Sequence, residues 1–224
     1  SYIMTVDVAQ GIGSDYSTFT IIDTSTKPFE VVAVYQDNMI SPILFPNIIY
    51  RFARKYNDAY LLVENNDQGM VVCNSLYYDI EYENMFVESV VKANSIGVRM
   101  TKKVKRIGCS NLKDLIENKE IIVKDHYMIS ELCTFESVGN SFSASNGNHD
   151  DLVMNLVLFS WFASTNMFKE MTNIDLKSLL YEEKLKMIED EISPVGFFND
   201  NDKPKYTTDS DGNMWQEIRQ TNLF

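Results

Sequence analysis

The first 36 residues contain three short apolar segments separated by turn residues, and this pattern constrains the fold more than any other feature of the chain. It predicts strands over about Tyr2–Ala9, Ser17–Asp23 and Glu30–Gln36. The stretches between them hold Gly, Ser and Pro, which are residue types that favour turns. The chain therefore begins with a three-stranded meander.

Helical and strand-like patterns alternate after the meander. Apolar residues recur at helical spacing over 42–56, and the apolar run over 59–64 indicates a fourth strand. The pattern further predicts helices over 69–78 and 101–118, strands over 86–91 and 121–123, and a helix over 150–166 that is apolar on nearly every face and therefore buried. This order favours an α/β fold with a mixed sheet and helices on both faces.

The composition changes beyond about Asn173. Helical amphipathic spacing continues over Leu176–Ile192, and Pro, Gly, Asp and Asn follow from Ser193 without clear periodicity. We expect residues 1–170 to form the main folded region and residues 171–224 to form a C-terminal helix and a loosely ordered tail of the same domain. The chain starts at Ser1, almost inside its first strand, so we expect it to be a fragment of a longer polypeptide.

Several classes of protein are excluded by absent signals. No apolar run reaches the roughly 18 residues that a membrane span needs, and no signal peptide is recognisable. The three cysteines are widely spaced and form neither a zinc-type pair nor a disulfide framework. The phosphate-loop, G-x-S-x-G and H-E-x-x-H motifs are all missing, which excludes a P-loop ATPase within this chain.

Three acidic residues stand at the ends of predicted elements, where a scaffold holds a side chain rigidly. Asp7 ends the first apolar run, Glu64 ends the fourth strand, and Asp151 opens the buried helix. Each acid taken alone is better explained as a helix cap or a solvated strand end, because Asp and Glu are usually exposed. Three carboxylates that converge on one point can instead hold Mg²⁺ or Mn²⁺, and two such ions roughly 3.5–4 Å apart catalyse phosphodiester hydrolysis.

Other residues near these acids have two interpretations each. Asp15 could bring a fourth carboxylate to the same place, or it could stabilise its own turn by an Asx hydrogen bond. Asp150 fits the N-cap of the buried helix better than a metal ligand. His149 could orient a water molecule or contact a phosphate, although a single loop histidine usually does neither.

The net charge of −12 argues against a protein that coats nucleic acid by charge alone, but the positive charge is concentrated. Residues 92–124 contain nine of the 20 Lys and Arg residues. Four of them lie close together and are candidates for contacting DNA phosphates: Lys102, Lys103, Lys105 and Arg106. The alternative is that they form a solvated helix face.

Four segments together resemble the nuclease domain of the large terminase subunit of T-even-type tailed bacteriophages, a member of the ribonuclease H-like superfamily. The resemblance covers about residues 1–170. Its motifs are Val6-Asp7-Val8 with Gly11 and Asp15, Val63-Glu64-Asn65, His149-Asp150-Asp151-Leu152-Val153-Met154, and the stretch from Thr101 to Ile116.

The resemblance implies a ribonuclease H-like mixed central sheet flanked by helices, with a C-terminal helical or irregular appendage. It also implies an endonuclease that cuts concatemeric viral DNA during genome packaging in the host cytoplasm. Asp7, Glu64 and Asp151 match the family's acidic triad, and Asp15 matches an additional acidic position. The expected cofactor is Mg²⁺, replaceable by Mn²⁺, with two ions bound. The expected partners are double-stranded DNA, an N-terminal packaging ATPase domain that is missing here, the portal and the small terminase subunit, with no membrane.

Two alternative functions remain open on the sequence. A junction-resolving or transposase-like relative could use the same triad on the same fold. A catalytically silent module that docks DNA or the portal would keep the basic stretch and would need none of the triad.

Overall fold

The computed structural model describes residues 1–90, 93–138, 141–172, 184, 206–208, 212 and 214–216. The chain divides into two units, Ser1–Ile174 and Asp175–Phe224. In the second unit, β10 (Tyr206–Thr208) and β11 (Met214–Gln216) pair antiparallel, and the sequence pattern did not predict them. The helix predicted over 176–192, apart from Lys184, lies outside the described residues, and the predicted division at residue 170 stays a prediction.

The first unit contains a five-stranded mixed sheet with the strand order β4-β1-β2-β3-β7. The predicted meander is confirmed, since β1 pairs antiparallel with β2 and β2 pairs antiparallel with β3. The edge strands β4 and β7 run parallel to β1 and β3, respectively. The strands are β1 (Tyr2–Asp7), β2 (Ser17–Asp23), β3 (Phe29–Asp37), β4 (Tyr60–Val63) and β7 (Ile121–Ile122).

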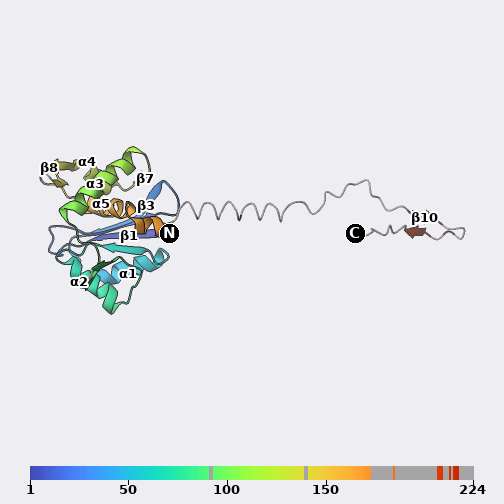
Figure 1. Cartoon of the computed structure of the whole chain (residues 1–224), viewed down its shortest axis with the longest axis horizontal. Coiled ribbons are helices and arrows are strands. Elements are labelled where there is room, and N and C mark those ends of the chain that lie inside the picture. Colours follow the sequence, from blue (N-terminus) through green and yellow to red (C-terminus); the bar gives the residue numbers. More distant parts are fainter. Residues whose placement is uncertain are drawn as a thin grey trace. The chain divides into compact units, whose positions relative to one another are not determined.

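Helices cover both faces of this sheet, as predicted (Figure 1). The first face is covered by α1 (Phe45–Lys55) and by α2 (Gly69–Asn74) with the π-helical turn η1 (Ser75–Asp79). The second face is covered by α3 (Lys102–Glu117), α4 (His126–Thr134), α5 (Asp151–Ala163) and α6 (Asn166–Thr172). No helix of the described residues is long and apolar enough to cross a membrane.

Alternating side chains along the strands divide the core into two layers. Met4 and Val63 pack with the helices α1 and α2, whereas Ile3 and Leu62 pack with α5. This two-residue period is what a sheet buried on both faces requires. It also decides the face on which any residue at the end of a strand lies.

The helix α5 lies between the sheet and α3, which explains why its sequence is apolar all round. The two helices approach closely at Gly108, where an added Cβ would lie 2.3 Å from the main-chain oxygen of Val157. Asn111 of α3 also donates a hydrogen bond of 3.3 Å to the main-chain oxygen of Ser160. The position of α3 is therefore fixed against α5.

The strand predicted over 86–91 lies outside the central sheet. It forms β5 (Val87–Val90), which pairs with β6 (Ala93–Ile96) in a separate hairpin. Isolated parallel bridges, Leu61 to Met85 and Glu64 to Val98, join the two ends of this hairpin segment to the β4 edge. A second hairpin pairs β8 (Phe135–Val138) with β9 (Ser141–Ala144), in a stretch for which the sequence predicted no regular structure.

Candidate active site

The side chains of Asp7 and Glu64 lie at the same edge of the sheet and on the same face of it. Asp7 ends β1, and Glu64 directly follows β4. The two strands are parallel with Val6 beside Val63, and the main-chain N–H of Glu64 donates to the oxygen of Val6 at 2.9 Å. The alternation of side chains puts both acids on the face that α5 covers.

Asp151 is the first residue of α5 and is held at this same edge by two hydrogen bonds to the start of β2 and the residue before it. One oxygen of its carboxylate (Oδ2) accepts from the main-chain N–H of Tyr16 at 3.2 Å. Its main-chain oxygen accepts from the hydroxyl of Thr18, also at 3.2 Å. Because Thr18 is the register partner of Asp7 in β2, these bonds bring Asp151 next to Asp7.

The three acids affect one another electrostatically. Burial raises the pKa of Asp7 well above its ordinary value, and the charges of Glu64, Asp151 and Asp150 raise it further. Burial raises the pKa of Glu64 to about 7, against the opposing effects of the Lys105 charge and a hydrogen bond from Asn66. The pKa of Asp151 is also raised, mainly by burial. The site thus holds more negative charge than its protein surroundings compensate.

The donor set fits a hard divalent cation, because it consists of carboxylate oxygens in a site with a local excess of negative charge. Among the described residues, however, no three His, Cys, Asp or Glu side chains stand grouped as a ready-made ligand set. The carboxylate of Asp151 already accepts a hydrogen bond from Tyr16, and that of Glu64 accepts one from Asn66. Each hydrogen bond engages one oxygen of its carboxylate and leaves the other oxygen able to bind an ion.

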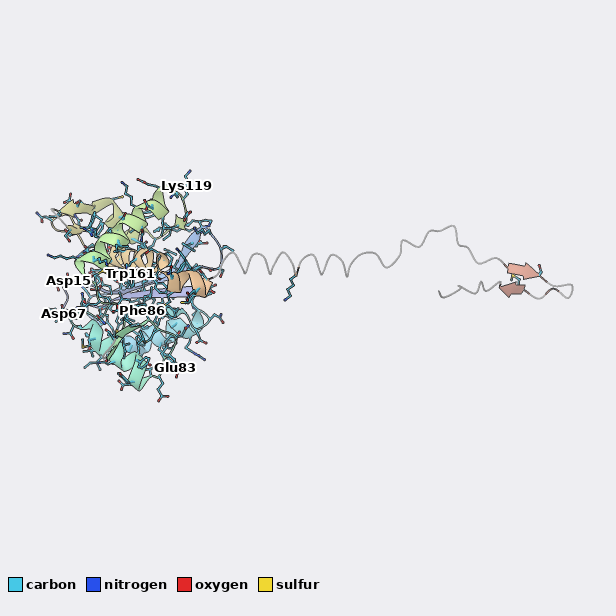
Figure 2. The ribbon with its side chains drawn as sticks, in the orientation of Figure 1. Asp15, Asp67, Glu83, Phe86, Lys119 and Trp161 are labelled. Carbon is cyan, nitrogen blue, oxygen red and sulfur yellow. The ribbon has the colours of Figure 1, made fainter. Side chains whose placement is uncertain are left out.

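Asp15 lies in the loop between β1 and β2, in the part of the first unit that also carries Asp67 (Figure 2). Its side chain is exposed, and its charge contributes to the raised pKa of Asp151. The Asx hydrogen bond that would make Asp15 a turn-stabilising residue is not present in the described part of the chain. The structure therefore places Asp15 near the triad without showing a contact to it.

The prediction that Asp150 caps α5 is right in position, but the expected hydrogen bond to its side chain is not formed. Asp150 occupies the N-cap position but makes no capping hydrogen bond. The first N–H groups of α5 instead donate to Oε2 of Glu131 in α4, from Leu152 at 2.8 Å and from Val153 at 3.1 Å. No local sequence signal indicates this contact, since Glu131 lies some 20 residues before the helix that it caps.

Asp150 and Asp151 have basic neighbours instead. The Nζ atom of Lys105 lies 3.8 Å from Oδ2 of Asp150, and Nδ1 of His149 lies 3.5 Å from Oδ2 of Asp151. Only 22% of the Lys105 side chain is exposed, and its charge also acts on Glu64. Lys105 therefore faces the acids, whereas the other three residues of the basic stretch are exposed on α3: Lys102, Lys103 and Arg106.

Comparisons with known proteins agree with the fold and with the family that the motifs indicated. The family described as the terminase RNaseH-like domain matches residues 4–166. The large terminase nuclease of the thermophilic phage G20c, solved with bound cobalt, is 21% identical, with a TM-score of 0.57 over 71% of this chain and 79% of that one. Its zinc-bound structure is 23% identical, with a TM-score of 0.52 over 70% of this chain and 78% of the other.

A more distant structure has the same fold. The human cytomegalovirus terminase nuclease domain, soaked with manganese, is 9% identical, with a TM-score of 0.52 over 74% of this chain and 83% of that domain. The predicted ribonuclease H-like fold is confirmed by these likenesses, and the narrower T-even-type assignment stays a prediction. Since the family match spans most of the sequence, the chain belongs to the family of terminase RNaseH-like domains.

Proposed function

We propose that this chain is the nuclease domain of a viral large terminase subunit and cuts DNA with the help of divalent metal ions. The observation that carries the proposal is the meeting of Asp7, Glu64 and Asp151 at one sheet edge, each on a rigid element. Family membership and the metal-containing terminase nucleases of the same fold support it. The proposed substrate is concatemeric double-stranded viral DNA in the host cytoplasm.

The proposed cofactor is a pair of Mg²⁺ ions, which Mn²⁺ can replace. Asp7, Glu64 and Asp151 would hold the ions, because their carboxylates lie together at one end of the sheet, and Asp15 is a less direct candidate. When bound, such ions supply an activated water and stabilise charge on the phosphate oxygens.

The protein's own residues would position these groups. Tyr16 and Thr18 hold Asp151 by hydrogen bonds, and Asn66 holds Glu64. Lys105 offsets part of the negative charge beside Glu64. The exposed Lys102, Lys103 and Arg106 on α3 would contact DNA phosphates without reading sequence.

The proposed partners are a packaging ATPase domain on the N-terminal side, the portal and the small terminase subunit. They follow from the family and not from a surface of this structure. The ATPase would move DNA, and this domain would cut it.

The test is nicking of supercoiled plasmid by the purified chain. We expect cleavage with Mg²⁺ or Mn²⁺, little turnover with Ca²⁺, whose looser coordination positions reactants poorly, and none with excess chelator. Preference for a four-way junction over a linear duplex would instead favour the resolvase-like alternative. DNA binding without metal-dependent cutting would favour the silent docking module.

A further inference from the structure

A polar cavity of about 540 Å³ adjoins the acidic site on the side of Glu64. One wall is the segment that directly follows Glu64, and the other is the segment that leads into α3. The lining of the cavity includes Asn65, Asn66, Asp67, Met70, Arg99 and Met100. Its volume is within the range of roughly 300–1,000 Å³ that is typical of small-molecule sites.

The side-chain amide of Asn66 links this cavity to the acidic site. Its Nδ2 atom donates to Oε1 of Glu64 at 3.0 Å and to the main-chain oxygen of Met100 at 3.1 Å. One amide therefore connects the Glu64 carboxylate with both walls. A group bound in the cavity would therefore be separated from the acidic site only by the Asn66 side chain.

Other contacts fix the two walls against each other. The main-chain N–H of Asn65 donates to the oxygen of Val98 at 3.0 Å, and its side chain donates to the oxygen of Ile96 at 2.9 Å. At Gly69 an added Cβ would lie 1.8 Å from the main-chain oxygen of Glu64, so α2 begins directly against that residue. The cavity is thus built into the scaffold before any ligand arrives.

The lining contains one positive and one negative side chain, so a simple anion or cation would be attracted by one of them and repelled by the other. Arg99 and Asp67 are both exposed in the cavity, and no ion pair joins them in the described part of the chain. A guanidinium binds a phosphate well, whereas a carboxylate repels a phosphate and accepts hydrogen bonds from amino groups. Met70 and Met100 add polarisable apolar surface. A nucleotide has all three complementary parts, namely a phosphate, an amino-bearing base edge and an apolar ring face.

We propose that this cavity is a subsite for one nucleotide of the bound DNA strand, adjacent to the phosphate that is cut. Arg99 contacts the nucleotide's phosphate, and Asp67 accepts from the exocyclic amino group of cytosine, adenine or guanine. Taking a base out of the stack costs least at frayed or single-stranded positions, so the subsite favours such DNA. The link to cleavage rests on the proposed function, whereas the binding site itself does not.

The experiment measures binding of dCMP, dTMP and inorganic phosphate to the whole chain in excess chelator, by calorimetry and by NMR shifts of the main-chain amides. Without metal, the acidic site repels phosphate, so the cavity is tested alone. We expect dCMP to bind more tightly than dTMP, which lacks the amino group, and more tightly than inorganic phosphate. The largest shifts are expected at Asp67 and Arg99.

Three variants locate the binding. Arg99→Met keeps the length of the side chain and removes the charge, and we expect it to weaken dCMP binding by about tenfold. Asp67→Asn should reduce the preference for dCMP over dTMP. Lys113→Met removes the same charge from an exposed position of α3 that lies outside both the cavity and the basic stretch, and it should leave dCMP affinity unchanged. If Arg99→Met folds poorly, Arg99→Lys takes its place. This variant preserves the charge and should retain part of the dCMP affinity.

The binding and cleavage results distinguish the subsite from the nuclease activity. Equal dCMP affinity in wild type and Arg99→Met, or an equal loss in Lys113→Met, overturns the subsite. Plasmid cleavage by a wild-type chain that binds no nucleotide in chelator overturns the subsite and leaves the nuclease proposal standing. Arg99-dependent nucleotide binding in a chain that never cuts DNA supports the subsite and contradicts the nuclease proposal.

Discussion

The Oε2 atom of Glu131 accepts a hydrogen bond of 2.8 Å from the main-chain N–H of Leu152, and thereby α4 caps the helix that carries Asp151. A second bond of 3.1 Å, from Val153, goes to the same oxygen. The start of α5 is therefore positioned by a different element, and not by its own N-cap residue. The place of Asp151 depends on this contact.

Replacing Glu131 should reveal that dependence. Glu131→Ala leaves two helix N–H groups without their acceptor and should lower the free energy of unfolding by about 0.5–2 kcal/mol, the range measured for lost N-caps. Glu131→Gln keeps an acceptor oxygen and should cost less. Urea unfolding of both variants checks the order, and equal losses would show that the carboxylate oxygen does not act as the cap.

Substitutions in the triad should separate chemistry from stability. Asp7→Asn, Glu64→Gln or Asp151→Asn should each nearly abolish metal-dependent plasmid cleavage. Each change also removes repulsion among the acids, so the melting temperature in chelator should hold or rise. Asp125→Asn is a matched control away from the triad: Asp125 caps α4 and Asn caps a helix equally well, so both cutting and stability should be nearly unchanged. A triad variant that retains substantial cleavage would remove that residue from the ligand set.

The raised pKa of Glu64 predicts how stability changes with pH. Its carboxyl group ionises near 4.5 ordinarily and near 7 in the folded chain, mainly because it is buried. The folded state therefore binds more protons between these values, so this contribution to stability is complete below about pH 4.5 and is lost as the pH rises through 7. Burial raises the pKa of Glu131 to about 7 as well, so its contribution to stability is also lost as the pH rises through 7.

Unfolding free energies in chelator at pH 5.5 and pH 8 test this expectation. We expect lower stability at pH 8, a smaller difference in Glu64→Gln, and recovery at pH 8 on addition of Mg²⁺, which binds the ionised acids. A chain that is equally stable at both pH values in chelator would contradict the buried, proton-binding state of these acids.

The basic stretch should divide into two functions. The triple variant Lys102→Ala, Lys103→Ala and Arg106→Ala removes up to three phosphate contacts, each worth roughly 0.9 in the log–log salt slope on duplex DNA. We expect weaker binding at low salt and a flatter slope by fluorescence anisotropy, with cutting partly restored by excess DNA.

Lys105→Met is the contrasting variant. Lys105 lowers the pKa of Glu64, so its removal should move the acidic limb of the cleavage–pH profile to higher pH and leave most of the salt slope intact. A slope as flat as that of the triple variant would place Lys105 among the DNA contacts instead. An unchanged slope in the triple variant would show that DNA enters over another surface.

The sequence predicted those strands and helices that are determined by the pattern of their own side chains. The strand over Ser17–Asp23 was predicted to the residue, because both faces of β2 are buried and turn residues flank it. The expected positions of Asp7 and Glu64 at strand ends followed from the same runs. Contacts between distant segments could not be read in this way. Neither the cap from Glu131 nor the bridge of Glu64 to Val98 has a local signature, because each depends on where a second segment lies.

The hydrogen bond from Thr18 to Asp151 joins residues that are 133 positions apart, and this distance along the chain has a consequence for synthesis. A ribosome makes β1, β2 and β4 long before α5, so a growing chain already contains Asp7 and Glu64 while their third partner does not yet exist. The acidic site is thus completed only after nearly the whole first unit has been translated. Unfinished chains would carry two of the acids and no assembled centre, which would spare nearby nucleic acid from premature cutting.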